Sequence, residues 1–226
     1  MSRTPEPGAV AHRAVRIPAG NVLLDADLSL PARARGVVLF AHGSGSSRFS
    51  PRNRHVASLL NEAGLATVLA DLLTRDEERV DDRTRHLRFD IGLLGERLVA
   101  AADWLKAEAD TAALPLGLFG ASTGAGAALV AAAIRPEAIA AVVSRGGRPD
   151  LAGDALAEVR APTLLIVGGH DVPVIRMNEE ALASLRADKR LAIVPGATHL
   201  FEEPGTLDAA ATLARDWFLH HLTREA

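Results

Sequence analysis

The sequence LPLGLFGASTGAGAALVAAAIR, residues 114–135, decides the fold of this chain. The apolar run that follows Pro115 predicts a buried strand, and the small and aliphatic residues at 125–134 predict a buried helix. The turn between them reads Gly-Ala-Ser-Thr-Gly and places Ser122 in a GxSxG pattern. Flanking glycines let two backbones pass closely, where a Cβ atom would collide. An ordinary glycine and serine turn is the alternative, and the rest of the chain decides between the two.

The position of Ser122 suits a nucleophile. A serine on a sharp strand-to-helix turn is held in strained backbone angles with its hydroxyl directed outward. The helix that follows adds partial positive charge at its N-terminus, where an oxyanion would form.

Length and composition are those of one globular domain. The chain has 226 residues, 48% hydrophobic and 23% charged, which excludes a disordered or fibrous protein. Because we find no repeat or linker, we expect a single domain over residues 1–226, with residues 1–12 as a loose lead-in. The net charge of −3 offers no basic field for nucleic acid. The sequence has no cysteine, which excludes disulfides and thiolate metal sites.

The sequence predicts no membrane partner. The N-terminus lacks an apolar core of signal-peptide length, and the longest apolar run is about half of the ~20 residues that a membrane span needs. We therefore expect a soluble, cytoplasmic protein.

Strands and helices alternate from residue 36 onward, which predicts a doubly wound α/β sheet with parallel central strands. Residues 14–17 and 22–30 form a leading antiparallel pair, because the second run alternates apolar and polar side chains. Residues 36–41 are apolar throughout, as in the middle of a parallel sheet. The segment 74–88 is densely charged and is predicted as a surface loop. The other expected elements are strands at 66–70, 139–143, 163–167 and 191–194, helices at 51–63, 91–105, 178–185 and from 206, and a short helical piece near 151–159.

Polar residues follow almost every predicted strand and should converge on one edge of the sheet. Among them, Ser122, Asp171 and His199 stand in the nucleophile–acid–base order of α/β-hydrolases. His199 would take the serine proton, and Asp171 would orient the imidazole. The alternatives are a surface-loop histidine and a turn or capping aspartate. Asp150 and Asp154 are rival candidates for the acid.

Two backbone amides should bind the oxyanion. One is that of Thr123, and the other comes from the His42-Gly-Ser-Gly loop, with Ser44 as the best candidate. The alternative for this loop is a flexible turn. We expect His42 to be structural, because it follows the wrong strand for the base.

Arg145 and Arg148 follow another strand at the same edge. Two guanidinium groups there could bind an anionic acyl group or a phosphate. Salt bridges to Asp150, Asp154 or the acidic residues at 76–82 are the alternative.

With these residues in place, the chain resembles the α/β-hydrolase superfamily, and more narrowly its dienelactone hydrolase-like branch. The resemblance covers nearly the whole chain and rests on GASTG at 120–124, GGHDVPV at 168–174 and PGATHLF at 195–201. It implies an α/β-hydrolase fold and a serine esterase with a Ser-His-Asp triad. The chain departs from dienelactone hydrolase itself, which uses cysteine where this sequence has Ser122. That departure favours general esterase chemistry over lactone hydrolysis.

We therefore expect hydrolysis of small carboxylic esters through an acyl-enzyme. About fifteen residues separate the strands at 139–143 and 163–167, which leaves no room for a cap domain and predicts an open site. A thioesterase or acyltransferase with the same triad, or a non-catalytic hydrolase-fold binding protein, are alternatives. The expected partner is a small-molecule ester, and the oligomeric state is left between monomer and homodimer.

Two other classes of protein fit the sequence poorly. GASTGAG matches neither common nucleotide-binding pattern. Val80-Asp81-Asp82 faintly resembles a phosphoribosyl-pyrophosphate motif, but Arg83-Thr-Arg follows it in place of a glycine-rich loop. The histidines lack metal-ligand spacing. We expect neither a metal nor a cofactor.

Overall fold

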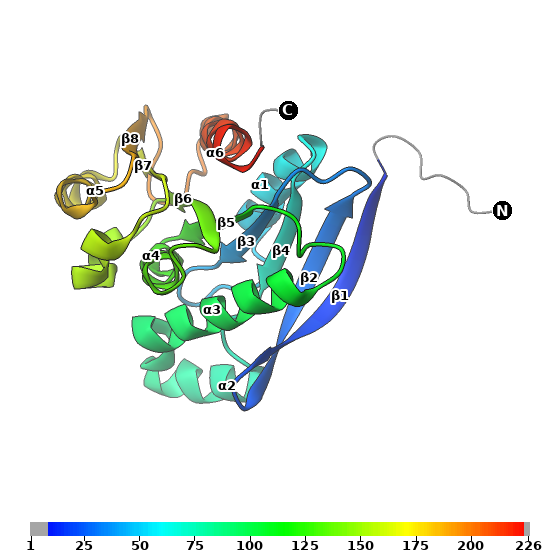
Figure 1. Cartoon of the computed structure of the whole chain (residues 1–226). Helices are drawn as coiled ribbons and strands as arrows, with labels where there is room; N and C mark the ends of the chain where they lie inside the picture. Colours follow the sequence, from blue (N-terminus) through cyan, green and yellow to red (C-terminus); the bar gives the residue numbers. More distant parts are fainter. Residues whose placement is uncertain (1–8, 224–226) are drawn as a thin grey trace.

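Eight strands form one sheet in the computed structural model, which describes residues 9–223 (Figure 1). Their order is β1-β2-β4-β3-β5-β6-β7-β8, antiparallel along β1-β2-β4 and parallel from β4 onward. The predicted α/β-hydrolase sheet with a leading antiparallel pair is confirmed. The strand bounds are β1 (Val10–Ala19), β2 (Val22–Pro31), β3 (Val37–Ala41), β4 (Ala66–Ala70), β5 (Leu116–Ala121), β6 (Ile139–Arg145), β7 (Thr163–Gly168) and β8 (Lys189–Val194).

Helices cover both faces of the sheet. One face packs against α1 (Pro51–Glu62) and α6 (Thr206–Leu222), and the other against α3 (Ile91–Ala107), α4 (Thr123–Ile134) and α5 (Val172–Ser184) (Figure 1). The 3₁₀ segment η2 (Pro149–Glu158) joins β6 to β7 and packs against α4 and α5. Within residues 9–223, none of the helices combines the length and the apolar surface that crossing a lipid bilayer requires.

The central strands are buried on both faces, as their unbroken apolar sequences predict. Every residue of β3, β4 and β5 is buried. Gly117 in β5 admits α6 closely, because a Cβ atom there would lie 2.6 Å from Cε1 of Phe218. Buried apolar strands thus fix the sheet edge on which the predicted site residues lie.

Three boundaries differ from the sequence prediction. Residues 10–12 belong to β1 and not to a loose lead-in; their side chains are largely exposed on this edge strand, so they carry no apolar pattern. Residues 1–8 of the predicted lead-in lie outside the described part. The last strand, β8, begins at Lys189, where exposed basic side chains hide the pattern. Helix α5 begins at Val172 and not at Asn178, which is buried and donates from Nδ2 to the carbonyl oxygens of Val174 and Gly147.

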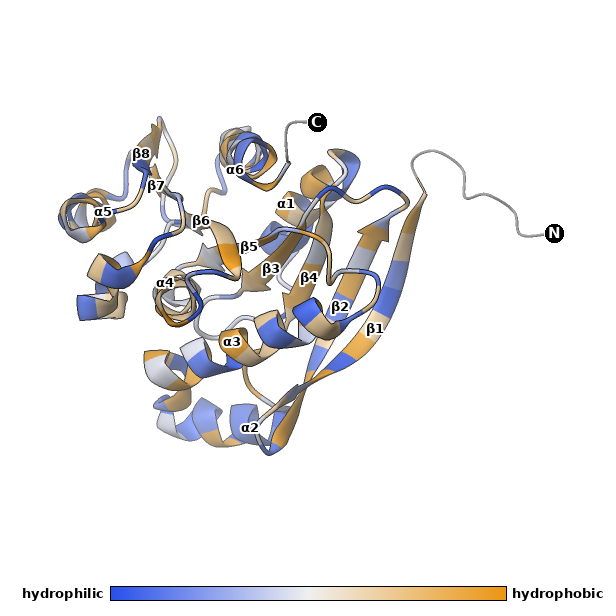
Figure 2. Ribbon diagram, in the orientation of Figure 1, coloured by the Kyte–Doolittle hydropathy of each residue, from blue (hydrophilic) through white to orange (hydrophobic). Residues whose placement is uncertain are grey.

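The charged segment 74–88 is helical where a loop was predicted. It forms α2 (Arg75–Thr84) and the short 3₁₀ turn η1 (Leu87–Phe89). Thr74 and Glu77 form a capping box at the start of α2. Figure 2 shows α2 as mostly hydrophilic, so its sequence has no apolar stripe that would predict a helix.

Candidate active site

Ser122 lies at the sharp turn between β5 and α4. Its φ of 51° and ψ of −124° are angles that residues other than glycine seldom adopt. A Cβ atom at Gly124 would lie 2.3 Å from the carbonyl oxygen of Ala41, and one at Gly120 would lie 2.4 Å from Cα of Ala125. Glycine is therefore required on both sides of the serine.

His199 lies between Ser122 and Asp171. Its Nε2 is 3.4 Å from Oγ of Ser122, and its Nδ1 is 2.6 Å from Oδ2 of Asp171. Asp171 follows β7 and His199 follows β8, so the parallel strands bring both to the C-terminal edge of the sheet. When Nδ1 donates its proton to the carboxylate, Nε2 is left as the basic nitrogen that faces the serine hydroxyl. The structure thus brings together the three residues singled out by their order.

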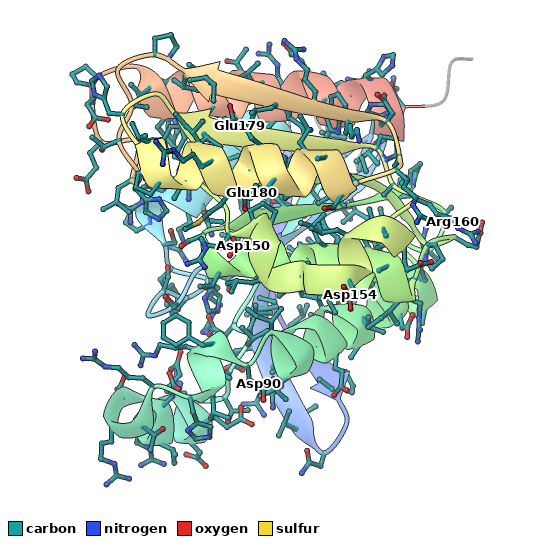
Figure 3. All side chains as sticks on the ribbon, turned by 90° about the vertical axis from the view of Figure 1, so that its left-hand side faces the viewer. Asp90, Asp150, Asp154, Arg160, Glu179 and Glu180 are labelled. Atoms are coloured by element: carbon teal, nitrogen blue, oxygen red, sulfur yellow. The ribbon has the colours of Figure 1, made fainter. Side chains whose placement is uncertain are left out.

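The rival acids lie on η2 (Figure 3), and neither forms a hydrogen bond with His199 among the described residues. Asp150 forms a bidentate ion pair with Arg148, at 2.8 Å to Nε and 2.7 Å to Nη2. Asp154 is exposed to solvent. Arg148 lines neither of the two cavities beside the site. The hydrogen bond to Asp150 raises the pKa of the Arg148 guanidinium, and burial lowers that pKa by a smaller amount. The carboxylate of Asp150 thus balances the charge of Arg148.

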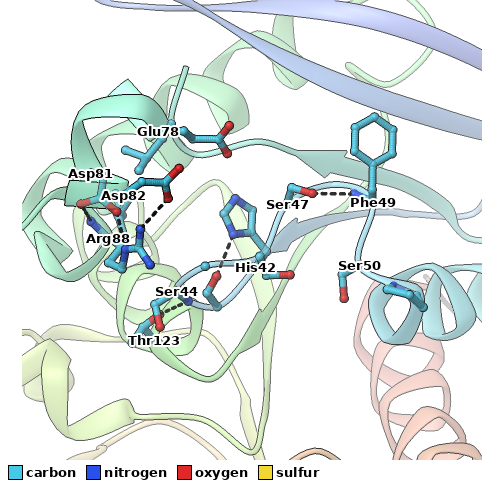
Figure 4. Close-up of a pocket in the computed structure, with 16 residues that line it drawn as sticks. His42, Ser44, Ser47, Phe49, Ser50, Glu78, Asp81, Asp82, Arg88 and Thr123 are labelled. Atoms are coloured by element: carbon cyan, nitrogen blue, oxygen red, sulfur yellow. Dashed lines mark hydrogen bonds and ion pairs between the residues drawn. The ribbon is translucent and has the colours of Figure 1, made fainter. Parts of the chain in front are cut away.

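The loop after β3 lies against the start of α4 (Figure 4). The amide of Ser44 donates to Oγ1 of Thr123 at 2.8 Å. Thr123 is the first residue of α4, so its own amide has no acceptor within the helix. The two residues predicted for the oxyanion hole are therefore adjacent, but the Ser44 amide already has an acceptor. Nothing in the sequence pattern indicated that the Thr123 hydroxyl would fill this place.

His42 is held entirely by backbone groups. Its Nδ1 donates to the carbonyl oxygen of Gly43 at 2.9 Å, and its Nε2 accepts from the amide of Leu72 at 3.1 Å. Burial lowers the pKa of the His42 ring, against smaller opposing effects of the Gly43 carbonyl and the Asp71 charge. A neutral His42 thus ties the loop to the segment after β4, away from the serine hydroxyl.

A cavity of about 260 Å³ lies directly beside Ser122 and His199. Arg145, the last residue of β6, lines it together with the beginning of α1. Sequence reasoning singled out Arg145 but missed Arg52 and Asn53 of α1, which no motif marks. The residues around this cavity are Gly43, Ser44, Ser46, Ser50, Arg52, Asn53, Ala121, Ser122, Arg145, Gly146, His199 and Leu200.

Arg145 is only 7% exposed. Its Nη2 donates to Oδ1 of Asn53 at 3.2 Å, and its guanidinium carbon lies 6.0 and 5.8 Å from the ring centres of Phe119 and Phe201. Its Nε and Nη1 are closed off from solvent and have no hydrogen-bond partner among residues 9–223. Burial, and to a lesser extent the charge of Arg52, lowers the pKa of Arg145 to about 10. Arg145 therefore stays protonated at neutral pH.

A second cavity, of about 460 Å³, borders the same loop (Figure 4). Glu78, Asp81 and Asp82 of α2 line it, as do Arg88 and the half-exposed Phe49. Burial raises the pKa of the Glu78 carboxyl, and the charges of Asp71 and Asp82 add to this. Helix α2 thus forms one wall of an acidic recess that borders the loop.

The chain matches known proteins over most of its length. The model of the dienelactone hydrolase family matches residues 24–222. Two Mycobacterium tuberculosis proteins that bear the provisional name phosphoribosyl transferase are 58% identical over 208 residues, which is 92% of this chain. The match covers 46% of those proteins, so this chain spans about half the length of the curated relatives.

Solved structures show the same fold. A dienelactone hydrolase from Anabaena variabilis is 64% identical with a TM-score of 0.93, and the match covers 94% of this chain and 99% of that one. A cold-adapted esterase from an Arctic intertidal metagenomic library has a TM-score of 0.76 at 19% identity, over 95% of each chain. At 19% identity, the match to the cold-adapted esterase shows a shared fold and nothing further.

Proposed function

Because this chain belongs to the dienelactone hydrolase family, we propose that it is a serine hydrolase that cleaves small carboxylic esters through an acyl-enzyme intermediate. The observation that carries the proposal is the hydrogen-bonded line from Asp171 through His199 to Ser122. A hydroxyl at its free pKa is a poor nucleophile, so a base at this distance is what ester cleavage by serine needs.

In the proposed first step, Oγ of Ser122 attacks the ester carbonyl carbon while Nε2 of His199 takes the hydroxyl proton. The carboxylate of Asp171 stays ionised, accepts a hydrogen bond from Nδ1–H and stabilises the imidazolium. Collapse of the tetrahedral intermediate breaks the bond between the carbonyl carbon and the alcohol oxygen, and His199 returns its proton to the leaving alcohol. Water then attacks the acyl-enzyme with the same base, which releases the carboxylic acid and restores Ser122.

We assign the developing oxyanion to the amides of Thr123 and Ser44. The Thr123 amide lies at the N-terminus of α4, where the helix adds partial positive charge. Thr123 Oγ1 holds the Ser44 amide in place, and that amide would share its hydrogen between Oγ1 and the oxyanion. Catalytic hydrogen bonds often form fully only once substrate is bound.

The surroundings of the site favour a small acyl group. His199 has 38% of its side chain exposed, and η2, the connection from β6 to β7, packs against α4 and α5 and not over the site. A thioester or an acyl acceptor other than water would use the same three residues. We favour the ester because the family and the open site both support hydrolysis of small substrates.

We assign no transferase activity to this chain. The name of the Mycobacterium tuberculosis relatives belongs to proteins about twice as long. Residues 80–82, which faintly resemble a phosphoribosyl-pyrophosphate motif, lie in α2, and the buried carboxylate of Asp81 is bonded to Arg88. A carboxylate so engaged is not free to bind a sugar hydroxyl.

Hydrolysis of p-nitrophenyl esters from acetate to decanoate tests the proposal. We expect wild type to prefer short acyl chains, and Ser122→Ala to lower kcat by about 10⁴-fold or more, as loss of a serine nucleophile does elsewhere. A fluorophosphonate probe should label wild type and leave Ser122→Ala unlabelled.

Ser184→Ala is the matched control, because this hydroxyl donates to the carbonyl of Glu180 at the end of α5 and has none of the proposed roles. It should retain wild-type rates. Wild type that is inert across the series, or a Ser122→Ala variant that keeps its rate, would contradict the proposal.

A further inference from the structure

The guanidinium of Arg145 is a buried charge without a counter-ion. Its contacts are the amide oxygen of Asn53 and two aromatic rings, and within residues 9–223 no carboxylate pairs with it. A buried charge without a partner destabilises the fold, because the energy lost on leaving water is not regained from an opposite charge. Arg145 lines the 260 Å³ cavity, so an anion that enters the cavity from solvent meets a guanidinium charge that no acid balances.

The N-terminus of α1 meets the same cavity. Ser50 is the N-cap residue of this 12-residue helix, and Pro51 follows at its first position. Ser50 and Arg52 line the cavity, and the N-terminus of the helix adds partial positive charge there. The hydroxyl of Ser46 adds a further donor on the facing loop.

The charge balance of the cavity is positive. Arg52 adds a second guanidinium, and its charge lowers the pKa of Arg145, which places the two within electrostatic reach. The acid that contacts Arg52 is Glu202, at 3.3 Å, and its side chain is 64% exposed, so solvent screens that pair. The positive groups at the cavity are thus two guanidiniums and a helix N-terminus, and the one carboxylate that pairs with them is exposed to solvent.

We propose that this cavity is a subsite for a phosphate group carried by the substrate, held by Arg145, Arg52 and the N-terminus of α1. A phosphate dianion matches the two guanidinium charges, and its three free oxygens match donors that approach from β6, from α1 and from the facing loop. A carboxylate has one charge and two oxygens, so it would leave one of the two guanidinium charges unmatched.

The subsite lies next to the nucleophile. Ser122 lines the same cavity, and its amide donates to the carbonyl oxygen of Arg145 at 3.3 Å. The inference rests on the proposed function only for the identity of the bond that is cleaved. It names the substrate class as a carboxylic ester that carries a phosphate monoester near the scissile bond, with the phosphate bound and not transferred.

Calorimetric titration of the Ser122→Ala protein with inorganic phosphate, at constant ionic strength, tests the subsite without any turnover. We expect saturable phosphate binding and at least tenfold weaker binding of acetate. The further substitution Arg145→Met should weaken phosphate binding by about tenfold or more, because hydrogen bonds to charged groups are the strong ones. Arg148→Gln is the matched control and should leave binding unchanged, since Asp150 already balances Arg148.

Arg52→Gln is a second variant, which tests the subsite if Arg145→Met fails to fold. Because Arg52 lies at the surface, we expect this variant to fold and to bind phosphate about threefold or more weakly than the protein with Arg52. A kinetic comparison uses wild type with 4-acetoxyphenyl phosphate, 4-acetoxybenzoate and phenyl acetate. We expect kcat/KM to be highest for the phosphate and the preference to disappear in Arg145→Met.

Absence of phosphate binding, equal binding of acetate, or binding that Arg145→Met and Arg52→Gln both leave unchanged would overturn the subsite. Phosphate binding by a protein that cleaves no ester would instead leave the subsite standing and contradict the proposed hydrolysis alone.

Discussion

Ser122 combines a reactive hydroxyl with a backbone conformation that opposes folding. A non-glycine residue in such a region costs on the order of 1–3 kcal/mol. Hydrogen bonds on both sides hold it there: its amide donates to Arg145, and its carbonyl oxygen accepts from the amides of Ala125 and Arg148 at 3.1 and 3.0 Å. The strain is therefore maintained by neighbours that belong to α4, β6 and the loop after β6. The same contact places Arg145 beside the nucleophile.

The hydroxyl of Thr123 is the residue-scale feature that the GxSxG pattern does not specify. We expect Thr123→Val to lower kcat for p-nitrophenyl acetate by about tenfold, with little change in KM. The reason is that valine removes the acceptor of the Ser44 amide and so releases the oxyanion loop from α4. Steady-state kinetics across substrate concentrations separates kcat from KM.

Thr123→Ser is the matched control, because it keeps the hydroxyl and the main-chain amide. It should retain kcat within about threefold. A higher kcat in Thr123→Val would mean that the hydroxyl competes with substrate for the Ser44 amide, and would contradict a supporting role.

The sequence was most informative where the fold itself imposes proximity. Ser122, Asp171 and His199 could be placed together because each follows a strand whose end lies at one edge of the sheet. The ion-pair partner of each arginine side chain could not be predicted in the same way. Whether Arg145 or Arg148 finds an acid depends on side-chain directions after β6, and the approach of α1 to the cavity depends on the loop after β3.

At the scale of elements, α2 is a helix that is stabilised by a capping box at its N-terminus and by ion pairs. Its capping box joins Thr74 and Glu77, and Glu77 also forms a bidentate pair with the buried Arg97 at 2.7 and 2.6 Å. Asp81 accepts from the amides of Leu87 and Arg88 and from the Arg88 side chain. A helix of this kind has no apolar stripe, so hydrophobic periodicity could not reveal it.

Asp81 should make the stability of the fold depend on acid. Burial alone would raise its pKa, but the hydrogen bonds from Arg88 and Leu87 hold the pKa of the Asp81 carboxyl below its ordinary value. A lowered pKa stabilises the fold fully above the unfolded-state pKa of about 3.9. This stabilisation declines below that value and is lost as the pH falls through the lower folded-state pKa. We expect Asp81→Asn to lower the free energy of unfolding by about 1–3 kcal/mol at pH 7, and the difference from wild type to shrink below pH 4.

Urea unfolding at a series of pH values measures this difference. Asp76→Asn is the matched control on the same helix, because Asp76 is 83% exposed and pairs with the exposed Arg79. It should change stability by less than about 0.5 kcal/mol at any pH. A difference for Asp81→Asn that stays constant down to pH 3 would contradict the linkage.

The strands were predictable because burial on both faces leaves unbroken apolar runs, and helix ends were less so. Ser50 and Pro51 marked the start of α1 correctly, since both act through local backbone chemistry. For α5, the sequence Asn178-Glu-Glu resembles a cap, yet Asn178 is a buried mid-helix residue bonded to the loop after β6. Only the tertiary contact distinguishes a buried asparagine from a capping one.

On the scale of the whole molecule, the sheet separates two apolar cores, and the site draws on both. Val38 in β3 packs into the core with α1 and α6, and the next residue, Leu39, packs into the core with α3 and α4. The cavity residue Asn53 comes from the α1 layer, whereas Thr123 comes from the α4 layer. The site is therefore assembled only while both layers are docked on the sheet.

The two layers should accordingly unfold together. The chain has two tryptophans, Trp104 against the α3 and α4 core and Trp217 against the α1 and α6 core, so Trp217→Phe and Trp104→Phe each leave a reporter for one layer. We expect both reporters to give the same urea midpoint, coincident with far-UV circular dichroism. Leu39→Ala should lower the free energy of unfolding by about 2–5 kcal/mol through the cavity it leaves, and should shift both midpoints equally although it lies in one core. A shift confined to the Trp104 reporter would show that the layers unfold independently, and the site would then not require both.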